Sequence, residues 1–270
     1  MLGSNNHQPL FSLIIVNYNT KKLVVDCLQS LFRHCPHHLF EVIVVDNNSS
    51  DGSVVGLREK FGEQVSVIAN EHNLGFGRAN NLATKNASGE LLFFLNSDTL
   101  VTDDILSPLA KMMSTHEKLG IISPRLLLPS GQNQPYCFGG FKWPLQKSCR
   151  QTNDLAVDER VDYWPIGWVS GAALVMRREL FVKLHGYDPH YFMYYEDLDL
   201  CYRARQSGYE VAVCPQVKLI HLGGKSSALR LRKKYYYRSQ TYFYHQHCGW
   251  LIAWLLQVIR WPWELYYHYR

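Results

Sequence analysis

The stretch Leu91–Val101, LLFFLNSDTLV, determines what kind of sheet this chain can form. It begins with five large apolar residues in an unbroken run, which is typical of a strand buried on both faces of a parallel sheet. The run ends on Asn96, Ser97 and Asp98, without a glycine or proline to turn the chain. Asp98 could cap a helix in the following TDDILSPLAKMM, or the strand could deliver its carboxylate to a site.

Strands and helices alternate along most of the chain around this run. The apolar pattern predicts further strands at Leu10–Val16, Glu41–Val45, Val65–Ala69, Gly171–Arg177 and Val211–Cys214. It predicts helices at Lys21–Cys35 after an N-cap at Thr20, and at Ser53–Phe61, Gly77–Asn86, Arg178–His185 and Asp197–Ser207. This alternation implies right-handed crossovers, so we expect an α/β fold with a mostly parallel central sheet. Residues 129–165, rich in Gly, Pro, Gln and Asn, read as loops that could fold over a ligand.

The C-terminal part of the chain differs from the rest in charge. From Val211 to Trp263 there is no Asp or Glu, and the Lys and Arg residues give +8, so the total of +5 leaves −3 for the remainder. With 270 residues, 47% of them hydrophobic, the chain can form one domain of roughly 200–250 residues, or two small ones. We predict a disordered terminus at 1–9, a globular domain at 10–227 and a basic, aromatic helical tail at 228–270.

The tail combines basic residues with tryptophan and tyrosine, which is the chemistry of a membrane interface. On a helix its polar residues fall in one narrow stripe, and Pro262 would kink or break that helix. The stripe comprises Gln257, Arg260, Glu264 and His268. Attachment to the inner face of the cell membrane is one interpretation, and packing on its own domain or in a homodimer is the other. Nucleic acid is not expected as a partner, because the tail has no nucleic-acid-binding motif.

Cysteine usage indicates the compartment. The seven cysteines are scattered and form no CxxC pair, which disfavours a zinc site. An odd number of cysteines without a signal peptide is typical of a reducing, cytoplasmic environment. No window reaches the ~18 uninterrupted apolar residues of a membrane span, so any membrane attachment would be peripheral.

Polar residues follow three of the predicted strands where each one ends. The segments are VNYN at 16–19, DNNSSDGS at 46–53 and NSDT at 96–99. In an open parallel α/β sheet, ligands bind beyond the carboxyl ends of the strands. Neither GxGxxG nor GxxxxGK[ST] is present, so a dinucleotide-binding fold and a P-loop are disfavoured. Asp98 and Asn96 offer hard oxygen ligands instead, which suit Mg²⁺ or Mn²⁺ bridging a diphosphate.

Six segments, in order along the chain, carry a resemblance to a known family. They are SLIIVNYN, EVIVVDNNSSDGS, HNLGFGRANN, LLFFLNSDT, VSGAALVMRRELFVKLHGYD and YYEDLDLCYRARQSGY. Between Leu10 and Ser226 the chain resembles a family 2 inverting glycosyltransferase with the GT-A fold. It looks most like the rhamnosyltransferase subgroup that builds bacterial surface polysaccharides. The resemblance implies an enzyme that moves a sugar from a nucleotide sugar to an acceptor hydroxyl.

The resemblance places the donor at the first two strand ends, which hold the nucleobase in such enzymes. A carboxylate there can accept the N3–H of uracil or thymine. The segment NLGFGRANN borders the donor, where Arg78 could meet a phosphate oxygen or could simply lie on a solvated helix face. The implied donor-binding residues are Val16, Asn17, Tyr18, Asp46, Asn73, Arg78 and Ser97.

The resemblance also implies a metal site. The family's DxD motif corresponds here to Asn96-Ser97-Asp98, and because Asn96 replaces the first aspartate, Asp98 should provide most of the metal binding. The family often places a histidine after the catalytic helix as a further ligand, and His221 has that place. A lone histidine is otherwise usually structural. The implied cofactor is Mg²⁺ or Mn²⁺.

One general base must take the proton of the acceptor hydroxyl as it attacks the anomeric carbon. The segment YYEDLDLCYR offers three acids, but neighbours on a helix point about 100° apart, so they cannot all face one hydroxyl. The family pattern makes Asp197 the base, with Glu196 as the second choice. Asp199 stands four residues before Arg203, so it reads as half of a helix salt bridge. One base without a separate nucleophile implies inversion.

We therefore expect a metal-assisted, inverting transfer from dTDP-rhamnose or a UDP-sugar to a glycan or lipid-linked acceptor in surface polysaccharide synthesis. Two other classes stay open. A nucleotidyltransferase would also use acid-bound Mg²⁺, but should show a basic, glycine-rich loop near the first strand, which VNYNTKK lacks. A non-catalytic nucleotide-sugar or glycan-binding module would keep the fold without turnover.

Overall fold

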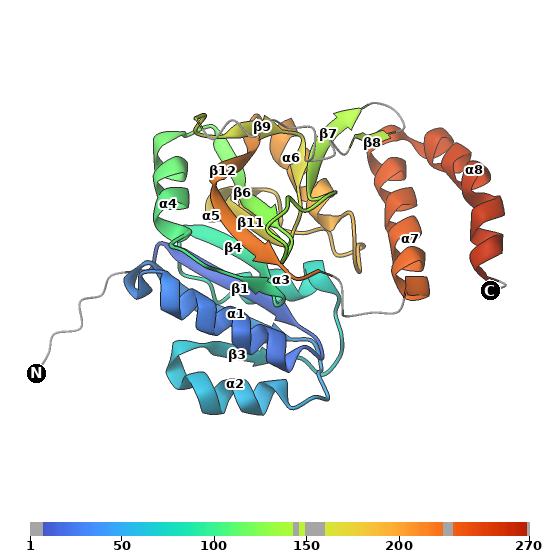
Figure 1. Ribbon diagram of the computed structural model, residues 1–270. Coiled ribbons are helices and arrows are strands. Elements are labelled where there is room, and N and C mark those ends of the chain that lie inside the picture. Colours follow the sequence, from blue (N-terminus) through green and yellow to red (C-terminus); the bar gives the residue numbers. More distant parts are fainter. Residues whose placement is uncertain (1–7, 143–145, 149–159, 224–228, 269–270) are drawn as a thin grey trace, which may run out of the picture.

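The chain folds around a curled central sheet, with a pair of helices beyond one end of it (Figure 1). These are α7 (Leu229–Cys248) and α8 (Trp250–His268). The computed structural model describes residues 8–142, 146–148, 160–223 and 229–268, with side chains at 8–141, 160–223 and 232–261. Most of the terminus predicted to be disordered lies outside the described residues.

The N-terminal half follows the predicted alternation of strands and helices. It contains β1 (Phe11–Asn17), α1 (Lys21–His34), β2 (Phe40–Asp46), α2 (Ser53–Phe61), β3 (Ser66–Ala69), α3 (Phe76–Thr84) and β4 (Leu91–Asn96), with 3-10 turns at His37–Leu39 and Gly62–Gln64. β1 lies between β2 and β4 and is parallel to both, and β3 is parallel to β2. The five apolar residues of β4 are all buried, which confirms a strand inside the sheet.

The second half makes the sheet mixed. Its strands are β5 (Thr99–Leu100), β6 (Leu119–Leu127), β9 (Trp164–Ile166), β11 (Ala173–Arg177) and β12 (Glu210–His221). The strand order is β3-β2-β1-β4-β11-β6-β12-β5, with β9 also pairing with β12. β11 is antiparallel to both β4 and β6, whereas β12 is parallel to β6. The parallel arrangement that the alternation predicts therefore describes the N-terminal half, and β11 reverses the direction.

Residues 129–165 contain more regular structure than the predicted loops. β7 (Phe138–Lys142) and β8 (Gln146–Ser148) join β10 (Trp168–Val169) in a small sheet of order β10-β7-β8. Residues 149–159 lie outside the described part of the chain. The remaining helices are α4 (Leu106–Thr115), α5 (Arg178–Lys183) and α6 (Glu196–Gln206). Gly208 follows α6 with φ +86°, as expected for a helix that ends at a glycine.

Two helix starts show which acids cap helices and which do not. Thr20 precedes α1, but its side chain gives no cap, and the Asp51 carboxylate accepts the Lys21 N–H instead at 2.8 Å. At α4 the N–H groups of Leu106 and Ser107 donate to Asp104 at 2.9 and 3.1 Å. Asp98 lies well before this helix and does not cap it. The strand that ends at Asn96 therefore leaves the Asp98 carboxylate for another purpose.

The tail forms a helical hairpin with Gly249 at its turn, where φ is +89°. Figure 1 shows α7 beside the domain and α8 on the outer side of α7. α8 continues through Pro262 to His268, so of the predicted kink or break at this proline, the break is wrong. Among the residues that the structure describes, no helix is both long enough and apolar enough to cross a membrane.

Candidate functional site

The ends of β1, β2 and β4 lie at one edge of the sheet. Asn17 is paired with Asp46 in the β1–β2 register, and Val16 is paired with Asn96 in the β1–β4 register. This places the three polar strand ends side by side, as the sequence predicts for neighbouring parallel strands. The site described below is built on this edge.

Asp46 is held by its neighbours rather than open to solvent. Asn17 Nδ2 donates to Asp46 Oδ1 at 2.7 Å, and the Ser49 N–H donates to Asp46 Oδ2 at 2.8 Å. Asn17 is 0% exposed and Asp46 1%. Each carboxylate oxygen has two lone pairs, so one further N–H could still be accepted. Tyr18, 41% exposed, is the accessible group of this strand end, and Val16 is half-buried beside it.

Asn47 belongs to this edge although the sequence does not single it out. Its side chain is 2% exposed, donates to the Gly75 carbonyl at 3.2 Å and accepts from Asn70 Nδ2 at 2.9 Å. These bonds fix the loop that leads into α3, where Asn73 Oδ1 accepts the Gly75 N–H at 2.9 Å. The one sequence feature that could have indicated a role for Asn47 is the pair of asparagines that follows Asp46.

Arg78 lies on the exposed side of α3, and its Nε donates to the Pro189 carbonyl at 2.8 Å. The start of α3 also contacts the segment before α6, because the Phe76 N–H donates to the Phe192 carbonyl at 3.0 Å. At Gly75, whose φ is +80°, any side chain would collide with that same carbonyl. The donor segment is thus fastened directly to the segment that carries the candidate base.

Asp98, Asn96 and His221 lie within contact of one another. His221 Nε2 is 3.1 Å from Asp98 Oδ1 and 3.3 Å from Asn96 Nδ2. The pairing of β5 with β12 places His221 opposite Thr99, next to Asp98. Gln134, a loop residue that the sequence pattern does not indicate, lies 2.8 Å from His221 Nδ1 through its Oε1.

This contact geometry fits a divalent cation. A Nδ1–H that donates to Gln134 leaves Nε2 with a lone pair that faces the Asp98 carboxylate, and two acceptors at 3.1 Å need a proton or a cation between them. No cluster of three or more His, Cys, Asp or Glu side chains suited to a metal occurs within the described residues. Asp98 and His221 would therefore need Asn96 as a third protein ligand, and its amide, which presents Nδ2 to His221, would turn to offer the oxygen.

The two candidate bases differ in accessibility. Glu196 is 6% exposed, whereas Asp197 is half-buried. Asp197 Oδ2 accepts the Gly171 N–H at 2.9 Å, and its Oδ1 accepts the Leu198 N–H at 2.8 Å. Backbone donors on both oxygens fix the direction of this carboxylate, so Asp197 is the better-placed acid of the pair.

Hydrogen bonds connect the three groups of residues. Thr20 Oγ1 donates to Asn17 at 2.7 Å and lies 2.9 Å from Ser97 Oγ, which joins the first strand end to the Asn96-Ser97-Asp98 segment. The Asn96 N–H donates to the Ala172 carbonyl at 2.9 Å. Ala172 follows Gly171, whose N–H holds Asp197. The candidate residues for the nucleobase, the metal and the general base are therefore connected by one chain of hydrogen bonds and neighbouring residues at the edge of the sheet.

A family model described as "Glycosyl transferase family 2" matches residues 12–201, which is more than half of the chain. The chain belongs to glycosyl transferase family 2. It is thus a glycosyltransferase by family, as the resemblance implies, and this family does not support the nucleotidyltransferase alternative.

Similar proteins agree with this family. The "O-antigen biosynthesis protein RfbC" of Myxococcus xanthus is 29% identical over 79% of this chain, which spans only 17% of that protein's length. The "N-acetylglucosaminyl-diphospho-decaprenol L-rhamnosyltransferase" of Mycobacterium tuberculosis is 26% identical over 81% of this chain and 79% of that protein. The crystal structure of GalNAc-T7 with UDP, GalNAc and Mn²⁺ superposes with a TM-score of 0.65 at 18% identity, covering 80% of this chain and 44% of that one. That likeness confirms the predicted GT-A fold.

Other titratable groups on and around α6 of this glycosyltransferase are buried or paired. Asp199 accepts from Arg203 Nε at 2.7 Å, which confirms the predicted helix salt bridge. Burial raises the pKa of the Cys201 thiol, so it stays protonated. Burial, and then the nearby Glu196 and Asp197 carboxylates, raise the pKa of the Tyr187 hydroxyl well above its ordinary value. Cys201 and Tyr187 are both 0% exposed, so neither side chain is accessible to a donor or an acceptor in this structure.

Proposed function

We propose that this chain transfers a sugar from a nucleoside diphosphate sugar to a hydroxyl of a lipid-linked or glycan acceptor, with inversion at the anomeric carbon. The observation that carries the proposal is the line of contacts from Asp46 through Asn17, Thr20 and Ser97 to the carboxylate of Asp197. A nucleotide bound along this line would place its diphosphate near Asp98 and its sugar near Asp197.

The proposed donor is dTDP-rhamnose or a UDP-sugar. Support comes from the rhamnosyltransferase name of the mycobacterial relative and from the UDP in the GalNAc-T7 structure. In this chain, Tyr18 and Val16 would contact the nucleobase, with Asn17 and Asp46 beneath them. Asn73, Arg78 and Ser97 would border the phosphates and the sugar.

We propose that Asp98 and His221, with Asn96, hold Mg²⁺ or Mn²⁺. When bound, such a cation neutralises charge on a leaving diphosphate. The Gln134 contact on His221 Nδ1 keeps the Nε2 lone pair available on the side of Asp98. The Mn²⁺ in the GalNAc-T7 structure supports the choice of metal.

Asp197 is the proposed general base, and Glu196 lies too deep to reach an acceptor hydroxyl. As the hydroxyl oxygen attacks the anomeric carbon, its proton passes to an Asp197 oxygen and the bond to the diphosphate breaks. The Gly171 and Leu198 N–H groups hold the carboxylate in place during this transfer. The protonated, buried Cys201 and Tyr187 offer no nucleophile for a double displacement, which favours inversion.

We further propose that the protein acts in the cytoplasm at the inner face of the membrane, held there by the outward face of α8. That face carries the exposed side chains of Trp250, Leu251, Trp254, Leu255, Val258, Ile259 and Trp261. Exposed basic residues Lys234 and Arg238 lie on neighbouring α7. Apolar and basic groups together match an anionic lipid surface, whereas two copies meeting at this face would bring like charges together. The decaprenol-linked substrate in the mycobacterial relative's name also supports a membrane acceptor.

The transfer chemistry is tested by donor turnover in the full chain. UDP-, dTDP- and GDP-sugars are screened with and without Mn²⁺ for release of nucleoside diphosphate. Asp197→Asn should lower turnover by about 10²-fold or more with donor affinity nearly unchanged, because general base catalysis supplies that range. Asp26→Asn, which changes a partly exposed acid on α1 that pairs with Lys22, is the control and should behave as wild type. Full turnover in Asp197→Asn together with loss in Glu196→Gln would move the base to Glu196.

The metal proposal is tested separately. Donor is titrated into wild type and Asp98→Ala, each with and without Mn²⁺. Tighter donor binding with Mn²⁺ in wild type but not in Asp98→Ala is expected. Equal metal dependence in both proteins would contradict the site.

A further inference from the structure

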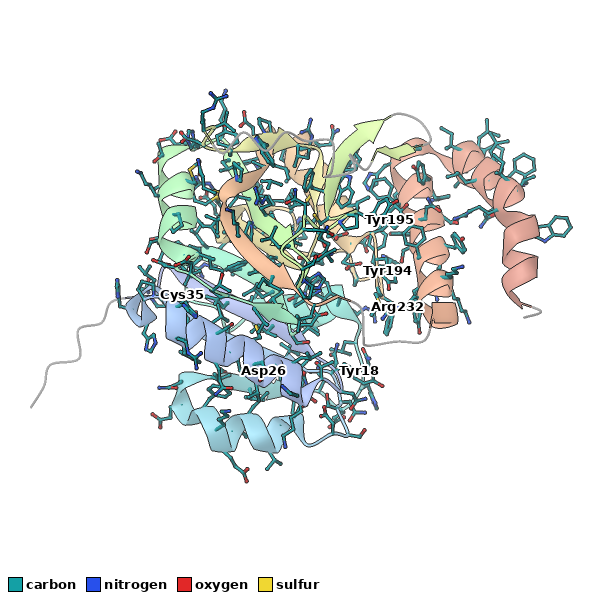
Figure 2. The ribbon with its side chains drawn as sticks, in the orientation of Figure 1. Tyr18, Asp26, Cys35, Tyr194, Tyr195 and Arg232 are labelled. Atoms are coloured by element: carbon teal, nitrogen blue, oxygen red, sulfur yellow. The ribbon has the colours of Figure 1, made fainter. Side chains whose placement is uncertain are left out.

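The turn that precedes the candidate base has an unusual backbone. Tyr194 and Tyr195 both have φ +68°, and they immediately precede Glu196 and Asp197 at the start of α6. Bulky side chains rarely adopt this left-handed region, and two in succession persist only where the surroundings hold them. Tyr195 is 2% exposed, so its surroundings can do so. Figure 2 shows both tyrosines where the domain meets α7, with Arg232 of α7 beside them.

The groups that hold this turn come from α7. Ser239 Oγ donates to the Met193 carbonyl at 2.9 Å, just before the two tyrosines. The Tyr236 ring lies 6.0 Å from the Tyr194 ring and 5.3 Å from the Tyr195 ring, measured between centroids. Ser239 is 5% exposed, so its hydrogen bond is shielded from water. A single helix of the tail thus fixes both the backbone and the rings of the turn.

α7 also contacts α6 on the far side of the base. His247 Nε2 lies 2.8 Å from Asp199 Oδ1, while Arg203 binds the other oxygen of that carboxylate. The His247 ring packs 4.4 Å from the Tyr202 ring. α7 therefore holds the chain before and after Glu196 and Asp197, although none of the hydrogen bonds and ring contacts described for α7 reaches Asp197 itself.

We propose that α7 is a positioning element of the transferase, in which Ser239, Tyr236 and His247 hold the strained turn and the first turn of α6 so that Asp197 faces the acceptor. This inference rests on the proposed role of Asp197 as the base. None of the three residues touches donor, acceptor or the reacting atoms in this scheme. They act by keeping Asp197 in place, and small displacements of a catalytic group lower rates strongly.

A positioning role differs measurably from a merely structural one. If α7 only stabilised the domain, removing its polar contacts would lower the melting temperature and leave turnover of the folded protein unchanged. If it positions Asp197, turnover falls while donor affinity stays, because none of the described hydrogen bonds of Asn17, Asp46 and Ser97 involves α7.

The test uses the full chain without vesicles and the panel sugar nucleotide that wild type hydrolyses fastest. Ser239→Ala and His247→Leu each remove one contact, and His247→Gln keeps a donor toward Asp199. His245→Ala changes an exposed histidine of the same helix and is the matched control. We measure kcat for nucleoside diphosphate release, the donor Kd by calorimetry, and the melting temperature.

The expected result is a kcat lowered about 10-fold in Ser239→Ala and His247→Leu, a donor Kd within about twofold of wild type, and partial recovery in His247→Gln. His245→Ala should match wild type. A wild-type kcat in a folded Ser239→Ala protein would overturn the proposal, as would equal loss in His247→Gln and His247→Leu. If His247→Leu does not fold, Ser239→Ala and Tyr236→Leu, which removes the ring beside Tyr194 and Tyr195, decide alone. A wild-type protein that hydrolyses no donor would instead refute the proposed transferase chemistry.

Discussion

α7 and α8 share one aromatic tail but relate to the domain in opposite ways. α7 buries Phe243 and Tyr244, which are 5% and 6% exposed, and Phe243 lies 5.5 Å from the Tyr195 ring. α8 leaves large apolar side chains in solvent, with Trp254 52% and Ile259 63% exposed. Composition alone left two interpretations of the tail open, packing on the domain and attachment to a membrane. α7 packs on the domain, whereas α8 keeps large apolar side chains exposed to solvent.

The orientation of α8 explains this free face. Arg260, a member of the predicted polar stripe, points toward α7, where it donates to Gln240 Oε1 at 2.7 Å and lies 5.3 Å from the Tyr237 ring. An ordinary surface helix turns its polar side to water and its apolar side to the core. Here Ala253 is buried while Gln257 of the predicted stripe is exposed, so α8 is apolar on more than one side and one apolar side is presented outward. Such a face calls for a partner, and the proposed one is the membrane.

Two truncations separate the helices most strongly. A chain that ends at Ser227 loses α7 as well as α8, uncovers Tyr195 and should be insoluble or unfolded. A chain that ends at Gly249 loses only α8 and should remain folded, release nucleoside diphosphate from the donor, and fail to bind anionic vesicles. Circular dichroism melting and co-sedimentation with phosphatidylglycerol/phosphatidylcholine vesicles measure both properties.

Either of two outcomes would break this contrast. A folded, active chain ending at Ser227 would show that α7 does not support the domain. The intact protein could instead stay in the supernatant with anionic vesicles and form a dimer in analytical ultracentrifugation. If the chain that ends at Gly249 is then a monomer, the face of α8 belongs to a second copy.

A matched pair of aromatic substitutions repeats the contrast with single side chains. Phe243→Ala should lower the free energy of unfolding by about 3–5 kcal/mol, because a buried aromatic ring leaves a cavity. Trp254→Ala should change that free energy by less than about 0.5 kcal/mol, since its ring is in solvent. Trp254→Ala should instead weaken vesicle binding about tenfold, the effect of one large apolar side chain no longer buried. Denaturant titration and vesicle partitioning give the two numbers, and similar stability losses in both variants would contradict the comparison.

The sequence was most informative where a local pattern alone determines structure. α2 spans Ser53–Phe61 as predicted, and the apolar run ending at Asn96 is a buried strand. Parallel neighbours align their ends, so the meeting of Asn17, Asp46 and Asn96 also followed from local patterns. The roles assigned to those residues stay predictions until ligands are tested.

The features that the sequence did not yield depend on contacts between distant segments. The segment that forms β6 contains Gly120 and Pro124, residues that weaken or end strands in sequence patterns. It is a strand because it pairs with β11 and β12. An apolar run carries no direction, so the antiparallel placement of β11 could not be predicted. Gln134 meets His221 from a loop 87 residues away in sequence. The outward face of α8 depends on which side of that helix meets α7.

Charge on α7 should contribute a smaller, salt-sensitive part of membrane binding. Lys234→Ala or Arg238→Ala should each weaken binding to anionic vesicles about fivefold at low salt, because one Lys or Arg near such a surface contributes roughly 1 kcal/mol. The loss should shrink as salt rises, since screening lengths fall to about 8 Å at physiological ionic strength. His245→Ala, on the same helix, should bind as wild type does. A deficit that persists with purely zwitterionic vesicles would mean that these residues do not act through lipid charge.

The smallest expected effect concerns alkaline pH and the docking of α7. Tyr242 donates to Asp188 Oδ2 at 3.0 Å, and burial, followed by this hydrogen bond, raises the pKa of Tyr242 to about 12. A tyrosine in an unfolded chain has a pKa of about 10, so folding favours the protonated hydroxyl. The stability that this group contributes is therefore present below about pH 10 and is lost as pH rises toward 12.

Tyr242→Phe should lower the free energy of unfolding by about 0.5–1.5 kcal/mol at pH 8, and the difference in that free energy between the variant and wild type should be smaller at pH 11. Urea titrations at both pH values measure this, with Tyr18→Phe, an exposed tyrosine that follows β1, as control. A difference between Tyr242→Phe and wild type that stays constant from pH 8 to 11 would show that this hydroxyl does not help to hold α7 on the domain.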